Sequence, residues 1–149
     1  MPFPPYDSIR RWTDGAYTVT TDPARFDHDV VTAFLANDSY WARGRTREQT
    51  GVAAAHSRCY SVLHDPSGRQ VGGARAVTDW MAFAWVADVF VVPSEQGHGL
   101  GKLLMRAVTD DLAHVERLFL GTRDAHGLYA QFGFAPPPRQ ERWMERLNP

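Results

Sequence analysis

Cysteine is almost absent from this chain of 149 residues, in which Cys59 stands alone. One cysteine excludes an internal disulfide and a cysteine-based zinc cage, and we expect no metal site. An excess of one charge is also lacking, because 16 Lys and Arg residues face 17 Asp and Glu residues. A general nucleic-acid binder would carry a strong basic excess, so we expect no nucleic-acid partner.

Long hydrophobic runs are lacking too. The longest, residues 80–87, is far too short to cross a bilayer, so we expect no membrane partner. Residues 1–6 are rich in proline and have neither the basic nor the apolar segment of a secretory signal peptide. We interpret residues 1–15 as a proline-containing N-terminal leader and expect a cytoplasmic protein.

Hydrophobic periodicity and turn residues predict one α/β domain over residues 1–149. Helices are expected at residues 26–36, 46–55, 99–113 and 125–132. Strands are expected at residues 16–21, 59–63, 70–77, 83–92, 115–120 and 142–147. This order predicts a mixed sheet flanked by helices. The last strand could also pair with a second subunit, which would give a homodimer.

A glycine-rich loop joins the strand at residues 83–92 to the helix at residues 99–113. Its sequence is QGHGLG over residues 96–101. Glycines let backbone N–H groups approach an anion closely, and a helix N-terminus adds partial positive charge, so the loop predicts phosphate or pyrophosphate binding. It is not a Walker A loop, because Leu103 stands where that motif needs Ser or Thr. It also lacks the Gly-x-Gly-x-x-Gly spacing of dinucleotide loops.

The loop fits a third pattern, Gln/Arg-x-x-Gly-x-Gly/Ala, and in this it is similar to the acyl-CoA pyrophosphate loop of the GNAT acetyltransferases. Residues 128–134, LYAQFGF, resemble the Leu-Tyr-x-x-x-Gly-Phe segment of the same family. The order of elements over residues 17–147 is similar as well. The resemblance implies a single-domain GNAT fold, whose mixed, mostly antiparallel sheet has a central splay, and it implies acetyl-CoA as the cofactor.

The resemblance also implies which residues contact the cofactor. Backbone groups of Phe90, Val91 and Val92 would pair with the pantetheine arm in the splay. The pyrophosphate would be held by the glycine-rich loop, through Gln96, Gly97, His98, Gly99, Leu100, Gly101 and Lys102. Thr122 stands where the family often carries an Asn that contacts the arm, so a hydroxyl contact would replace an amide contact.

Two residues are candidates for catalysis. Tyr129 stands where the family often carries a tyrosine that protonates the leaving thiolate of CoA, although it could instead be a tyrosine packed at the rim of a helix. Asp88 is the only charge in strand 83–92, which we expect to be buried on both faces. Desolvation should then raise the pKa of Asp88 and suit it to act as the base. The alternative is a structural ion pair with Arg75 or Arg123.

Aromatic side chains between the first two helices and on nearby strands could line an acceptor pocket for an apolar or cationic amine. These are Tyr40, Trp41, Trp80, Phe83 and Trp85. Asp124 and His126 could line the same site, although Asp124 could equally cap a helix and His126 could face solvent. Arg43, Arg45 and Arg47 form either a solvated face or a patch that attracts an acidic acceptor.

Together these features predict an acetyl-CoA-dependent N-acetyltransferase. It would move an acetyl group directly to an amine of a small molecule or a peptide. The alternative is a non-catalytic module that binds or senses acyl-CoA, and Thr122 leaves room for it because the family's Asn is missing there.

Overall fold

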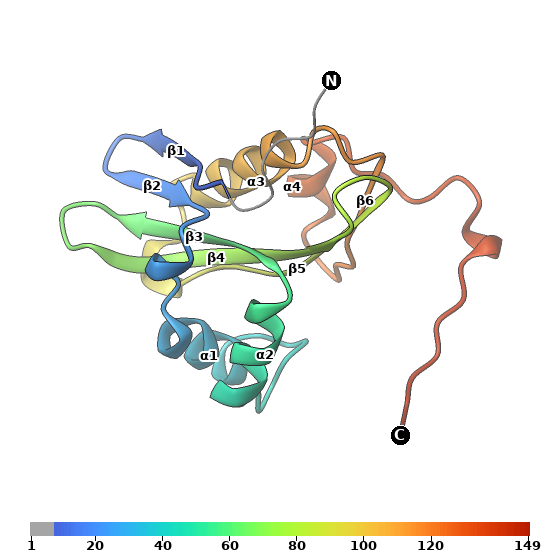
Figure 1. Cartoon of the computed structure of the whole chain (residues 1–149), viewed down its shortest axis with the longest axis horizontal. Helices are drawn as coiled ribbons and strands as arrows, with labels where there is room; N and C mark the ends of the chain where they lie inside the picture. The colour runs from blue at the N-terminus through green and yellow to red at the C-terminus, as the bar shows by residue number, and fades with distance from the viewer. Residues whose placement is uncertain (1–7) are drawn as a thin grey trace.

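The structure is a computed structural model that describes residues 8–149 (Figure 1). A sheet of six strands runs in the order β1-β2-β3-β4-β5-β6. The strands are β1 (Arg11–Asp14), β2 (Tyr17–Thr20), β3 (Arg58–His64), β4 (Arg69–Thr78), β5 (Phe83–Val91) and β6 (Arg117–Phe119). The α-helices are α1 (His28–Asn37), α2 (Arg47–Ala55), α3 (Leu100–Asp111) and α4 (His126–Ala130).

The sheet is mixed and mostly antiparallel, as predicted. Each pair of neighbours from β1 to β5 is antiparallel, and β6 lies parallel to β5. These last two strands are paired only where Phe83–Trp85 face Arg117–Phe119, whereas β5 continues to Val91. The chain beyond β6 leads away to α4, so this side of β5 has no strand partner among residues 8–149. The gap is the splay that the family resemblance implies.

Helices cover both faces of the sheet. Figure 1 shows α3 and α4 on one face and α1 and α2 on the other. The stripe of α3 formed by Leu100, Leu103, Leu104, Ala107 and Val108 is buried against the main core, as its helical spacing predicts. A smaller core under α1 joins Val31, Leu35, Ala42 and Phe90. The two cores hold β5 between them, and β5 therefore has a fixed position relative to both helical layers.

Local capping sets where two helices begin. The Asp27 carboxylate accepts the N–H groups of Asp29 and Val30 at the start of α1. Thr46 and Gln49 bond to each other's backbone N–H groups at the start of α2, which is a capping box. The cap at Thr46 marks the end of the α1–α2 connector (residues 38–46), the segment that reaches the candidate site.

The predicted N-terminal leader is wrong in part. Residues 11–14 form β1, which pairs with β2, while residues 1–7 lie outside the described chain. Arg10 and Trp12 both donate to the Asp110 carboxylate of α3, at 2.9 and 2.8 Å. Contacts between distant parts of the chain leave no local pattern in the sequence. The short strand β1, which such contacts hold in place, therefore cannot be predicted from local sequence alone.

A buried carboxylate fastens α3 to the sheet. Asp111 has a side chain that is 3% exposed and accepts two hydrogen bonds from Arg58, at 2.9 and 3.1 Å. The Tyr60 hydroxyl donates to it at 2.7 Å, and Arg10 does so at 3.2 Å. A carboxylate with this many donors tolerates burial, because each lost contact with water is replaced.

Two further expectations are corrected. At its start, strand β5 is buried on one face only. Phe83 and Trp85 are 40% and 43% exposed, whereas Ala84 and Val86, which point to the other face, are buried. No strand forms at residues 142–147. The chain makes a 3₁₀ turn at Gln140–Arg142, and the residues after it project away from the body of the protein (Figure 1).

Within residues 8–149, no helix is both long and apolar enough to cross a membrane.

Candidate acetyl-transfer site

The glycine-rich loop bends at two residues with left-handed backbone. Gly97 has a φ of +88° and Gly99, the N-cap of α3, has a φ of +75°, a conformation that favours glycine. No side chain caps α3, so its first N–H groups remain open to a ligand. The loop borders a shallow cavity of about 280 Å³ lined by Val91, Glu95, Gln96, Gly97, Gly99, Leu100, Gly101, Lys102 and Leu128. This arrangement suits an anion at the helix N-terminus.

His98 is placed differently from the rest of the loop. Its Nδ1 lies 3.1 Å from the Tyr17 hydroxyl and 3.4 Å from the Glu95 carboxylate. Tyr17 donates to the same carboxylate at 2.6 Å. The His98 side chain therefore ties the loop to β2 and does not line the loop cavity, which leaves only its backbone for the predicted cofactor contact.

The three residues expected to pair with the cofactor arm, Phe90 and Val91 of β5 and Val92 directly after it, do not all face the splay. The Val92 N–H donates to the Val71 carbonyl at 2.8 Å, so its backbone faces β4. The Val91 carbonyl accepts from the Gln96 amide at 3.1 Å, which places it on the opposite side. Backbone N–H and C=O groups point to alternate sides along a strand, so those of Phe90 face β4, as those of Val92 do. Val91 is therefore the one residue of these three whose backbone faces the gap.

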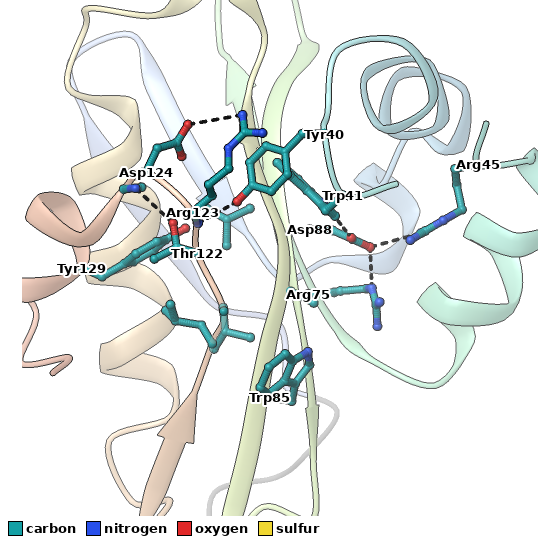
Figure 2. Close-up of a pocket in the computed structure, with 16 residues that line it drawn as sticks. Tyr40, Trp41, Arg45, Arg75, Trp85, Asp88, Thr122, Arg123, Asp124 and Tyr129 are labelled. Carbon is teal, nitrogen blue, oxygen red and sulfur yellow. Dashed lines mark hydrogen bonds and ion pairs between the residues drawn. The ribbon is translucent and has the colours of Figure 1, made fainter. Parts of the chain in front are cut away.

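A larger cavity of about 560 Å³ lies at the other end of the splay (Figure 2). Its walls come from β4, β5, the α1–α2 connector, the segment after β6 and α4. The residues that line it include Tyr40, Trp41, Arg45, Arg75, Trp85, Asp88, Thr122, Arg123, Asp124 and Tyr129. We call this cavity the acceptor pocket.

Tyr129 is 9% exposed and reaches the acceptor pocket from α4. Within residues 8–149 its hydroxyl has no hydrogen-bond partner. Burial, together with the nearby Tyr40 and Asp124, raises the pKa of Tyr129 above its ordinary value. The phenol is therefore protonated at neutral pH and can donate into the pocket.

The segment that leads into α4 positions three predicted residues. The Thr122 hydroxyl accepts the Ala125 N–H at 3.0 Å and so shapes the turn before α4, while the residue also lines the pocket. Asp124 lines the pocket as expected but does not cap the helix, whose N-cap is Ala125 without a side-chain bond. His126 begins α4 and is not among the residues that line the acceptor pocket.

Asp88 sits at a bulge in β5. Between one pair of partners and the next, β5 advances by one more residue than β4, and Asp88 takes a left-handed φ of +53°, which Asp tolerates better than most residues. Its carboxylate accepts from Arg75 Nε at 2.6 Å, from Trp41 Nε1 at 3.0 Å and from Arg45 Nη1 at 3.3 Å (Figure 2).

The expected raised pKa of Asp88 is wrong. Burial acts in that direction, but the hydrogen bond and charge of Arg75, with help from Trp41 and Arg45, outweigh it and lower the pKa below its ordinary value. The structure thus contains the Arg75 ion pair that the sequence leaves open as an alternative. Arg45 was foreseeable as part of a basic cluster, but nothing local in the sequence places Arg75 and Arg45 on one carboxylate.

The aromatic residues divide between two places. Tyr40, Trp41 and Trp85 line the acceptor pocket. Trp80 instead stacks on His114, with ring centroids 5.9 Å apart, and Phe83 packs on Phe119 at 5.3 Å. The prediction that these last two line the pocket is wrong, because they lie toward the start of β5, where β6 pairs with it.

The comparisons with known proteins agree with this geometry. The model of the acetyltransferase (GNAT) family matches residues 7–134. The chain belongs to the GNAT family. A Gibberella zeae protein named for acetyltransferase activity is 28% identical over 142 residues, which covers 82% of this chain and 80% of that protein.

Solved structures agree with this assignment. A GNAT-family protein of Xanthomonas campestris has a TM-score of 0.83 and 40% identity, covering 89% of this GNAT chain and 94% of its own. A Mycobacterium tuberculosis protein in complex with coenzyme A shares the fold, with a TM-score of 0.64 and 20% identity over 78% of this chain and 70% of its own.

The Asp88 ion pairs predict a pH-dependent stability. A carboxyl whose pKa is lowered by folding stabilises the protein above its unfolded pKa, and this contribution is lost as pH falls below about 4. We expect Asp88→Asn to reduce the free energy of unfolding at pH 7 by about 3 kcal/mol, because it leaves two guanidinium groups unpaired. The difference from the parent should shrink as pH falls below about 4, as measured by urea unfolding.

Asp110→Asn is the matched control for this experiment. Asp110 also pairs with an arginine, but its side chain is 54% exposed, so a change below about 1 kcal/mol is expected. Equal losses from the two substitutions would contradict the special weight given to Asp88.

Proposed function

We propose that this GNAT protein is an acetyl-CoA-dependent N-acetyltransferase that moves the acetyl group directly to an amine. The observation that carries the proposal is the unpartnered hydroxyl of Tyr129 at one end of a splay whose other end is the open N-terminus of α3. Two adjacent residues of α4 link these ends, since Leu128 borders the loop cavity and Tyr129 borders the acceptor pocket.

In this proposal the cofactor lies extended along the splay. Its pyrophosphate would bind the N–H groups of residues 97–101, with Lys102 close by. Its arm would follow β5 past Val91, and its thioester would reach the acceptor pocket beside Tyr129. The coenzyme A in the Mycobacterium tuberculosis neighbour supports this use of the fold.

The chemistry follows from the groups at the pocket. A neutral amine attacks the thioester carbonyl, the new C–N bond forms and the C–S bond breaks. Tyr129 gives its proton to the departing sulfur and regains one from solvent. Asp88 is already bonded by three donors, so we assign the amine's surplus proton to water and give Asp88 the task of positioning Arg45 and Arg75.

A second candidate is a non-catalytic module that binds or senses acyl-CoA. Two observations favour it: the carboxylate expected to act as base is held in ion pairs, and Thr122 is used in a backbone turn. Intact acetyl-CoA binding without transfer to any amine would support this candidate. The cytoplasmic setting stays a prediction.

Acetyl-CoA should raise the melting temperature of the protein. Ligand at about 100 times its dissociation constant stabilises by about 2.7 kcal/mol, which for a chain of this size is a shift of roughly 5–10 °C. Gly97→Glu should abolish the shift, since it places a carboxylate where the pyrophosphate would bind. Gly68→Glu is the control, because Gly68 also has a positive φ, of +69°, but lies in the turn between β3 and β4. Loss of the shift in both variants would count against the loop assignment.

Tyr129→Phe should lower kcat by about a hundredfold, measured as thiol release from acetyl-CoA, while the shift in melting temperature is retained. Tyr40→Phe removes a second hydroxyl from the same pocket. That hydroxyl accepts the Arg123 N–H at 2.8 Å, so its loss should act on the KM of the acceptor more than on kcat. Unchanged turnover in Tyr129→Phe would remove Tyr129 from the mechanism.

A further inference from the structure

The acceptor pocket carries more positive than negative charge. Its lining includes the guanidinium groups of Arg45, Arg75 and Arg123 and the carboxylates of Asp88 and Asp124. The two acidic residues differ in what they can offer a ligand. Asp124 is at the mouth, with a side chain that is 66% exposed, and its nearest cation is Arg123 at 3.9 Å. Asp88 is inside, with a side chain that is 7% exposed.

The Asp88 carboxylate has no room for a further cation. Arg75, Trp41 and Arg45 already donate to its two oxygens. One carboxylate between two guanidinium groups leaves a net positive charge at the inner end of the pocket. An acceptor with a second ammonium group would meet this charge with no carboxylate free to receive it.

The same contacts leave donors unused on the two arginines. Arg45 uses Nη1 for Asp88, and Arg75 uses Nε for Asp88 and Nη1 for Ser57 at 3.4 Å. Their remaining N–H groups have no partner within residues 8–149. Both side chains are about one-fifth exposed, at 19% and 20%, and both line the pocket. The free N–H groups of a guanidinium held in a fixed position suit hydrogen bonding to the two oxygens of a carboxylate.

We propose that the acceptor is an amine that also carries a carboxylate, such as an amino acid, and that Arg45 and Arg75 bind this carboxylate. The inference rests on the proposed acetyl transfer. The ammonium would lie toward Tyr129 and the mouth, where Asp124 is available, and the carboxylate would lie inside. The flat rings of Tyr40, Trp41 and Trp85 provide apolar walls for the carbon skeleton between them.

Matched pairs of amines test this proposal. The protein is supplied with acetyl-CoA and either L-tryptophan or tryptamine, and either L-phenylalanine or phenethylamine, and thiol release is measured. We expect kcat/KM to be higher for the carboxylates by about tenfold or more, the value of a charge-assisted hydrogen bond. Arg45→Gln should bring the ratio close to one, mainly through KM, and Arg45→Lys should restore part of it.

Arg47→Gln is the control, because Arg47 is 67% exposed and pairs with Asp29 on the surface. It should leave the ratio unchanged. Preference for the decarboxylated amines, or no turnover of either carboxylate while acetyl-CoA still raises the melting temperature, would overturn the acceptor class alone. Absence of that melting shift would instead overturn the proposed function.

A second inference comes from the tail (residues 143–149). The tail projects from the body of the protein in Figure 1, and Met144 and Leu147 are 97% and 81% exposed. It leaves from beside β6, because the Trp143 ring packs against Phe119 with centroids 4.6 Å apart. Within residues 8–149 the outer edge of β6 has no strand partner. One chain thus carries both an extended apolar arm and an open strand edge next to its base.

We propose that two copies of the chain exchange tails, each lying against the open edge of β6 in the other copy. The three prolines at residues 136–138 stiffen the segment before the tail, which favours exchange over folding back onto the same chain. An extended tail places Trp143 and Leu147 on one side and Met144 on the other, so each side carries an exposed apolar side chain. Exchange would pair the open edge of β6 in both copies and give the exposed apolar side chains of the tail a surface to pack against.

Light scattering after size-exclusion chromatography tests the exchange. We expect the full chain to have twice the 16.8 kDa mass of one copy. Removal of the tail, or the double change Met144→Asp with Leu147→Asp, should give single copies with an unchanged circular dichroism spectrum. Val52→Asp, at a residue of α2 that is 59% exposed, is the control and should keep the double mass. A full chain of single mass, or a double mass that survives tail removal, would overturn the exchange.

Discussion

The carboxylate of Asp88 is the point on which the site depends. A bulge in β5 turns this side chain toward the α1–α2 connector, where Trp41 and Arg45 meet it, while Arg75 reaches it from β4. Two separate parts of the chain, the connector and β4, are therefore fixed to one charged group on β5. The same bonds orient the arginine edges and the Trp41 ring that form the inner wall of the acceptor pocket. Asp88, which its sequence context suggests as a catalytic base, holds Trp41, Arg45 and Arg75 in position around the pocket.

The splay provides the other constraint. Strand β5 is paired with β6 only at its beginning, so its later residues border an open gap that ends at the bare N-terminus of α3. The short helix α4 spans the distance between the loop cavity and the acceptor pocket. The fold thus places the open N-terminus of α3 and the hydroxyl of Tyr129 toward opposite ends of the splay.

Much of this was predictable from the sequence. The glycine-rich loop and the buried stripe of α3 depend on local patterns, and both formed where their residues predict. The misses share a physical cause, since they depend on contacts between distant segments. Strand β1 is held by α3, the pKa of Asp88 is set by arginines from two other elements, and Trp80 finds its partner in His114. The strand expected at residues 142–147 does not form, because the turn before it leads the chain away from the open edge of β6.

In the proposed mechanism a single cofactor connects the glycine-rich loop with Tyr129. The most direct test is a titration of the protein with coenzyme A, followed by the NMR shifts of assigned backbone amides. We expect the largest shifts on residues 97–102, on Val91 and on the residues around Tyr129, all with one binding curve. Shifts confined to the opposite cavity around Cys59 and Trp80, or no shifts at all, would contradict it.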